Sequence, residues 1–97
     1  MAIRVIIERK VKEGRQSEMI SILRELRALA LPRRGYISGE TLRSKDDPSA
    51  YIVISTWESV EDWEAWRNHP ERNEVSKRLE QVLVTPERYS IFVYVYP

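Results

Sequence analysis

Cysteine is absent from this chain, which excludes a disulfide framework, a thiol nucleophile and zinc bound by cysteine. Neither sign of charge is in excess, because 16 Lys and Arg face 15 Asp and Glu, for a formal net charge of +1. This balance argues against nucleic acid or an anionic membrane as the main partner. No apolar run is long enough for a membrane helix, and the first residues lack a signal-peptide pattern. We therefore expect a cytoplasmic protein.

The chain also lacks the common motifs of nucleotide, metal and serine chemistry. It has no Gly-rich phosphate loop, no G-x-S-x-G elbow and no H-E-x-x-H motif. Its one histidine, His69, has no cluster of carboxylates beside it in the sequence. Asp46 and Asp47 fit a turn better than a catalytic pair. The sequence thus predicts no metal and no bound cofactor, and its 97 residues predict a single domain over 1–97.

Apolar residues recur with strand and helix spacing along the chain. The predicted elements are strands at 2–11, 36–44, 51–57 and 89–96 and a helix at 16–31. Ser59 is a suitable N-cap for a second helix, which should pause before Pro70 and resume to about Leu83. The order strand–helix–strand–strand–helix–strand is that of a ferredoxin-like α+β fold. It predicts a four-stranded antiparallel sheet with both helices on one face.

The third and fourth strands are apolar on both of their faces. A sheet that helices cover on one side should alternate apolar and polar residues, yet 51–54 and 91–96 do not. Soluble monomers rarely expose a large apolar patch, so a second copy of the sheet should cover the free face in a homodimer. Of Phe92 and Val93, one should point to the partner and the other to the helices. The alternative is that this face remains exposed to solvent, with tyrosine hydroxyls and charged residues at the sheet edges making it sufficiently polar.

The segment from the third strand to the helix break holds all three tryptophans and the histidine. It builds either a heavy core or a flat apolar pocket. Trp66 suits both roles, since an aromatic face stacks on planar substrates, whereas Trp57 and Trp63 are assigned to the core or an interface. His69 is either a proton carrier, since histidine titrates near neutrality, or a helix-end residue held by local hydrogen bonds. Asn68 is either a pocket donor or a cap.

Several stretches of the chain form a pattern together with this order of elements. They are Thr56–Ser59, Trp63, Ala65–Arg67, His69–Glu71 and the terminal Arg88–Tyr96. A chain with this pattern resembles the antibiotic biosynthesis monooxygenase family of dimeric α/β-barrel proteins. The resemblance covers the whole chain. It implies a homodimer in which two sheets form a barrel-like interface, and a pocket between the helices and the sheet of each subunit.

Members of that family include cofactor-independent oxygenases of aromatic polyketides and haem-degrading enzymes. The haem-degrading branch uses an Asn on the first strand, a Trp on the second helix and a His in the helix that follows. Only Trp66 matches here, so haem degradation is not expected. The aromatic-oxidising branch implies a pocket of Trp, Asn, Tyr and Arg side chains, for which Trp66, Asn68 and either Tyr36 or Arg67 are available.

The resemblance therefore implies a cofactor-independent monooxygenase that acts on a small aromatic or quinonoid molecule. Trp66 is the expected pocket wall and Asn68 and His69 its polar helpers, so these three are the candidate catalytic residues. Such a pocket holds a planar substrate away from water while a proton is removed. The alternative is a non-catalytic dimeric module that binds a small molecule. RNA binding on the sheet is disfavoured, because the charge is near neutral and the strands lack an aromatic-plus-basic signature.

Overall fold

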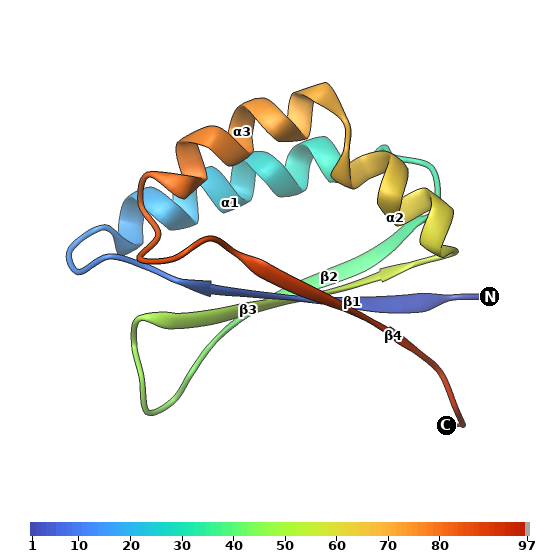
Figure 1. The fold of residues 1–97 in the computed structure, drawn as a ribbon, viewed down its shortest axis with the longest axis horizontal. Coiled ribbons are helices and arrows are strands. Elements are labelled where there is room, and N and C mark those ends of the chain that lie inside the picture. The colour runs from blue at the N-terminus through green and yellow to red at the C-terminus, as the bar shows by residue number, and fades with distance from the viewer. Residues whose placement is uncertain (97) are drawn as a thin grey trace.

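The computed structural model describes residues 1–96. They form helices packed on a single four-stranded sheet. The elements in chain order are β1 Ile3–Lys10, α1 Gln16–Ala30, β2 Tyr36–Arg43, β3 Ala50–Trp57, α2 Val60–Arg67, α3 Pro70–Glu80 and β4 Arg88–Val93. This is the predicted ferredoxin-like α+β fold, with the second helical region divided in two (Figure 1). In the part of the chain that is described, no helix is long and apolar enough to cross a membrane.

The four strands form one antiparallel sheet in the order β2-β3-β1-β4. β1 is central, since its Val5 pairs with Ser55 of β3 on one side and with Ile91 of β4 on the other. The helices lie on one side of the sheet, and the opposite side carries none of them (Figure 1). One face of the sheet is therefore available to form a core with the helices, as the sequence predicts.

Local signals set the helix ends in the region of the tryptophans. Ser59 caps α2, because its hydroxyl accepts a hydrogen bond from the backbone N–H of Asp62 at 3.1 Å. Pro70 stands in the first turn of α3, where a backbone N–H is not needed. His69 caps α3, since its Nδ1 accepts from the backbone N–H of Glu71 at 3.1 Å. The predicted pause is confirmed as a break between two capped helices.

Two elements end earlier than the sequence predicts. Helix α3 stops at Glu80, although the apolar pattern continues to Leu83. Leu83 is nonetheless only 4% exposed, so its apolar character reflects burial in the following turn rather than a longer helix. Strand β4 stops at Val93 instead of Tyr96, because Val93 pairs with Ile3, the first residue of β1, and nothing in β1 remains to pair with the residues beyond it.

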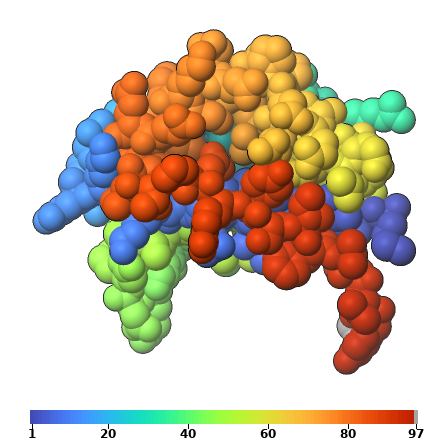
Figure 2. All heavy atoms as spheres, viewed as in Figure 1, coloured from blue at the N-terminus to red at the C-terminus, as the bar shows by residue number. Residues whose placement is uncertain are grey.

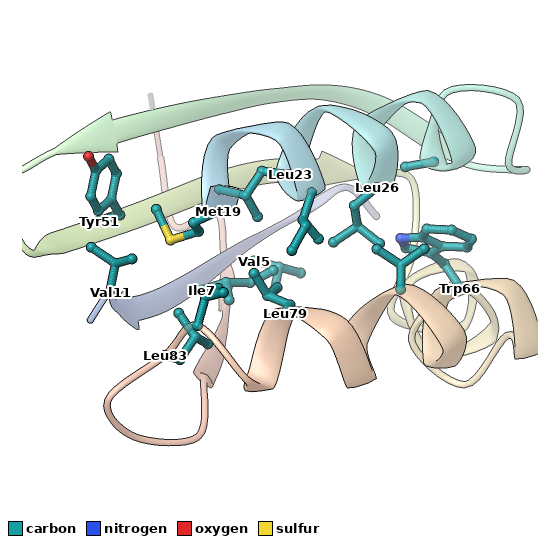
Figure 3. Packing of buried hydrophobic residues seen from close by; sticks show 14 of the residues in the cluster. Val5, Ile7, Val11, Met19, Leu23, Leu26, Tyr51, Trp66, Leu79 and Leu83 are labelled. Carbon is teal, nitrogen blue, oxygen red and sulfur yellow. The ribbon is translucent and has the colours of Figure 1, made fainter. Parts of the chain in front are cut away.

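The core lies between the sheet and the helices. On β1 every second residue faces the helices, and Ile3, Val5 and Ile7 are at most 5% exposed. Helix α1 contributes the predicted stripe of apolar side chains, which meets those of β1 and α3 (Figure 3). The same alternation puts the next such residue of β1, Arg9, on the helix-facing side, where it is only 4% exposed. A charged side chain thus enters the core layer.

The face of the sheet away from the helices carries an apolar centre. Ile6 pairs with Ile54, and Leu42 pairs with Ile52, so these four side chains share that face. Phe92 joins them and is 52% exposed. This face is the one that the apolar pattern of the third and fourth strands predicts to be uncovered within one subunit.

Val93 points to the helix side of the sheet, as expected for one of the two residues Phe92 and Val93, but the helices do not bury it. Val93 pairs with Ile3, so it belongs to the helix-facing side of the sheet. It is 59% exposed, however, because the helices do not reach over the end of β4. Of the two neighbouring side chains, only Phe92 then lies on the face that a partner can cover.

Gly35 is expected to be intolerant of a side chain. It has a φ of +83° in the turn before β2, and a Cβ there would collide with the carboxylate of Asp62. Gly35→Ala should lower the free energy of unfolding by about 2 kcal/mol. Gly14→Ala is the matched control, because Gly14 also has a positive φ, +79°, but nothing within 4 Å of the added methyl. Chemical denaturation that shows equal losses for both variants would contradict the collision.

Candidate functional site

A cavity lies between the helical layer and the β2–β3 side of the sheet. Its volume is about 80 Å³, and together with its open mouth the hollow spans about 550 Å³. All three helices and strands β1, β2 and β3 contribute side chains to its wall. The lining includes the exposed Arg27 and the buried Arg9 and Arg72. The pocket expected between the helices and the sheet is therefore present.

All three tryptophans line this cavity. Trp57 and Trp63 are each 1% exposed, and Trp66 is 4% exposed. The ring of Trp57 stands edge-on to Tyr36 at 5.2 Å and to Trp63 at 5.8 Å between centroids, geometries that stabilise aromatic pairs. The two alternatives for this segment, core or pocket, are thus not exclusive, because the same buried rings form both.

The ring of Trp66 has two polar neighbours that do not line the cavity. Trp66 lies near the end of α2, beside Leu26 of α1, and both line the cavity (Figure 3). The guanidinium carbon of Arg33 is 5.2 Å from the ring centroid of Trp66, and the ring of His69 is 5.8 Å away. A cation held over an aromatic face is attracted to it. The wall residue therefore has its orientation set by polar neighbours.

Asn68 and His69 do not line the cavity. The side chain of Asn68 donates to the backbone carbonyl of Glu64 at 2.9 Å and closes the end of α2. His69 caps α3, as described above. Both side chains make the local hydrogen bonds of helix-end residues, one of the two alternatives that the sequence leaves open. Their assignment as catalytic residues, together with that of Trp66, stays a prediction.

Donors surround the imidazole of His69 on both sides. Its Nδ1 faces the backbone N–H of Glu71 at 3.1 Å, and its Nε2 lies 3.1 Å from Nη1 of Arg33. A neutral imidazole has one acceptor nitrogen, so each tautomer satisfies only one of these contacts. Arg33 is held in place by the carboxylate of Glu71 at 2.6 Å and by the carbonyl of Leu29 at 3.3 Å.

The structure brings together a buried ion cluster that the sequence did not indicate. Nη2 of Arg9 lies 3.1 Å from Oε2 of Glu87, and Nη2 of Arg72 lies 3.6 Å from the same oxygen. The side chains of Arg9 and Arg72 are 2% and 9% exposed. Burial lowers the pKa of both guanidiniums below the ordinary arginine value, and Glu87 opposes this shift. Arginine remains charged despite such shifts.

This cluster joins residues that lie far apart in the chain. Arg9 comes from β1, Arg72 from the first turn of α3 and Glu87 from the segment before β4. One signal was present in the sequence, since Arg9 continues the alternation of Ile3, Val5 and Ile7 on the helix-facing side of β1. No signal marks Arg72 or Glu87. Among residues 1–96, no three His, Asp or Glu side chains gather closely enough to hold a metal ion.

Comparison with known families identifies the class of protein that this fold and cavity define. A family model described as "Antibiotic biosynthesis monooxygenase" matches residues 2–78. The chain therefore belongs to the antibiotic biosynthesis monooxygenase family.

Two curated proteins of Streptomyces are similar to this chain. "Protein SchA" of Streptomyces halstedii is 30% identical over 80 residues, which are 80% of this chain and 20% of that protein. The "42.8 kDa protein in whiE locus" of Streptomyces coelicolor is 28% identical over 69 residues, which are 71% of this chain and 17% of that protein. The chain thus spans about a fifth of the length of these relatives.

Solved structures share the fold at low sequence identity. SnoaB, a cofactor-independent oxygenase from Streptomyces nogalater, superposes with a TM-score of 0.89 at 16% identity and covers 99% of this chain and 95% of its own. A conserved protein from Methanosarcina mazei Go1 also reaches a TM-score of 0.89, at 18% identity, with 95% and 91% of the two chains covered. These matches establish the fold and leave the substrate open.

Proposed function

We propose that this protein is a cofactor-independent monooxygenase that acts on a small aromatic or quinonoid molecule. The observation that carries the proposal is the cavity between helices and sheet, whose wall contains three tryptophans and the half-buried Tyr36. Flat, rigid aromatic walls suit a planar ligand. The family of the chain and the described activity of SnoaB, a protein of the same fold, support the same class of reaction.

The proposed reaction needs a site that holds the substrate and excludes water. The substrate loses a proton from an activated CH₂ group, and the resulting carbanion supplies electrons to dioxygen. One oxygen atom enters the product as a carbonyl, and the other leaves as water. Trp66 is the proposed wall residue. Because Asn68 and His69 lie outside the cavity lining, their proposed contribution is to hold the end of α2 and the ring of Trp66 in position.

A homodimer formed through the open face of the sheet is part of this proposal. The apolar centre of that face around Ile6 and Ile54 has no cover within one subunit. The β2–β3 loop and the C-terminal segment project beyond the sheet on this side, one at each end (Figure 2). Tyr94, Val95 and Tyr96 of the C-terminal segment are 51%, 87% and 82% exposed. A second copy seated between the two projections would cover these apolar side chains.

Oxygen uptake with anthrone-type compounds tests the proposed activity. The wild-type protein should consume one molecule of oxygen per substrate without added metal, flavin or haem. Trp66→Ala should lower kcat/KM by about 100-fold, because the planar substrate loses the wall that positions it. Trp66→Phe is the matched control, which keeps a flat wall and should retain most activity. Thermal unfolding of both variants separates loss of the wall from loss of the fold.

A non-catalytic module that binds a small molecule is the second candidate. It is favoured by one observation, that Asn68 and His69, the polar helpers expected from the sequence, make helix-cap hydrogen bonds outside the cavity lining. Quenching of tryptophan fluorescence by planar hydroxylated compounds, with no oxygen uptake, would support this function over the oxygenase.

A further inference from the structure

The cavity wall carries more positive than negative charge. Arg9, Arg27 and Arg72 line it, whereas Glu40, the one acidic residue of the lining, pairs with Ile54 and so directs its side chain to the opposite face of the sheet. Glu87 lies behind the wall and is shared by two of the arginines, through the same oxygen. One carboxylate therefore faces two buried guanidiniums, which leaves a net positive charge at the inner end of the cavity.

Several donors in this wall have no partner. Within residues 1–96, Nε of Arg9, Nε of Arg72 and Nε1 of Trp63 are buried without a hydrogen-bond acceptor. All three belong to residues that line the cavity, and all three are N–H donors. Burying an unpartnered donor is costly, and burying an unpaired charge is more so. The site therefore lacks hydrogen-bond acceptors and negative charge to match its buried donors.

We infer that the cavity binds an aromatic ligand with an ionised oxygen group, a carboxylate or a phenolate, which sits against Arg9 and Arg72. A guanidinium presents its N–H groups as a planar fork that matches the two oxygens of a carboxylate. This inference deepens the proposed function, because it names the charge of the ligand in the same cavity. It is tested by binding alone, without turnover.

The shape of the hollow fits a ligand of this kind. The cavity has a volume of about 80 Å³ and opens into a hollow of about 550 Å³, so part of a ligand can extend toward solvent. The three tryptophans and the buried arginines line the same cavity. The anionic group would then lie inward against the arginines, and the aromatic body would lie outward.

Binding of 2-naphthoate and 2-naphthamide, measured by tryptophan fluorescence and by calorimetry at neutral pH, tests this inference. The two compounds have the same shape, but only naphthoate is an anion. The wild-type protein should bind naphthoate at least ~10-fold more tightly, because a charge-assisted hydrogen bond is worth more than a neutral one. Raising the salt concentration should weaken this preference little, since both guanidiniums are shielded from solvent.

Two variants locate the preference. Arg72→Gln should reduce the naphthoate preference to less than about twofold, since a bidentate charged donor is lost. Arg34→Gln removes the same charge from a side chain that is 94% exposed and should leave the preference unchanged. If Arg72→Gln does not fold, Arg9→Gln replaces it with the same expectation. The wild-type comparison of the two compounds stands without either variant.

Three results would overturn the inference: equal affinity for the two compounds, no binding of naphthoate at millimolar concentration, or an equal loss of preference in Arg34→Gln and Arg72→Gln. Its failure is separable from that of the oxygenase. Tight binding of naphthoate with no oxygen uptake from any anthrone-type compound supports the anion site and rejects the monooxygenase. Equal affinity for naphthoate and naphthamide, together with oxygen uptake, supports the monooxygenase and rejects the anion site.

Discussion

Glu87→Gln should lower the free energy of unfolding by about 3–5 kcal/mol, the usual cost of removing one partner from a buried ion pair. Glu87 is the carboxylate that both Arg9 and Arg72 reach, at 3.1 Å and 3.6 Å. Glutamine is nearly the same size and keeps an acceptor oxygen, but it brings no negative charge. Two buried guanidiniums would then face each other uncompensated, and each raises the cost of burying the other.

Urea denaturation of the wild type, Glu87→Gln and Glu80→Gln measures this effect. Glu80, at the end of α3, is exposed and forms no ion pair in residues 1–96, so its replacement should change the free energy by no more than about 0.5 kcal/mol. Similar small losses for both variants would show that solvent already compensates the arginine pair. Added naphthoate should stabilise Glu87→Gln by at least as much as it stabilises the wild type, because it supplies the missing negative charge.

Phe92→Asp should dissociate the proposed dimer. Phe92 pairs with Arg4 on the open face of the sheet and is 52% exposed in the subunit. Removing the apolar ring of Phe92 from the interface costs about 2 kcal/mol, even where Arg4 on the neighbouring strand pairs with the new carboxylate, and a two-fold interface carries the change twice. The dissociation constant of the dimer should therefore rise by about a thousandfold. The free energy of unfolding of the isolated subunit should change little, because the side chain is half exposed there.

Sedimentation equilibrium at micromolar concentration checks this expectation. Val60→Asp serves as the control, because Val60 is an apolar residue that is 37% exposed, on the helical side, and an acidic residue is favourable at the start of α2. This variant should remain a dimer. A wild-type protein that sediments as a monomer would reject the proposed interface outright, and a Phe92→Asp variant that stays dimeric would place the interface elsewhere.

The fold was predictable because its signals are local. Alternation in β1, the apolar stripe of α1, the Ser59 cap and the break at Pro70 each depend on residues close together in sequence, and each is confirmed. The errors lie at element ends, where long-range pairing decides. β4 is shorter than its apolar run because β1 offers no partner beyond Ile3. The sequence of β4 alone cannot show where its partner strand ends.

The candidate site was predictable only in part. Trp66 was named from its position on a short aromatic helix, and it lines the cavity. Asn68 and His69 were named because they follow it, yet their hydrogen bonds are those of helix ends. A helix turn points neighbouring residues in different directions, so proximity in sequence does not place a side chain in the same pocket.

By itself, the sequence determined the order of elements, the apolar character of both faces of the sheet and the family resemblance, since periodicity and composition carry that information. Only the tertiary structure decided that Arg9, Arg72 and Glu87 meet, that all three tryptophans face one cavity, and that Val93 is left uncovered. The physical reason is the same in each case. Burial and charge pairing depend on which distant segments pack against one another, and strand pairing and helix packing set those contacts.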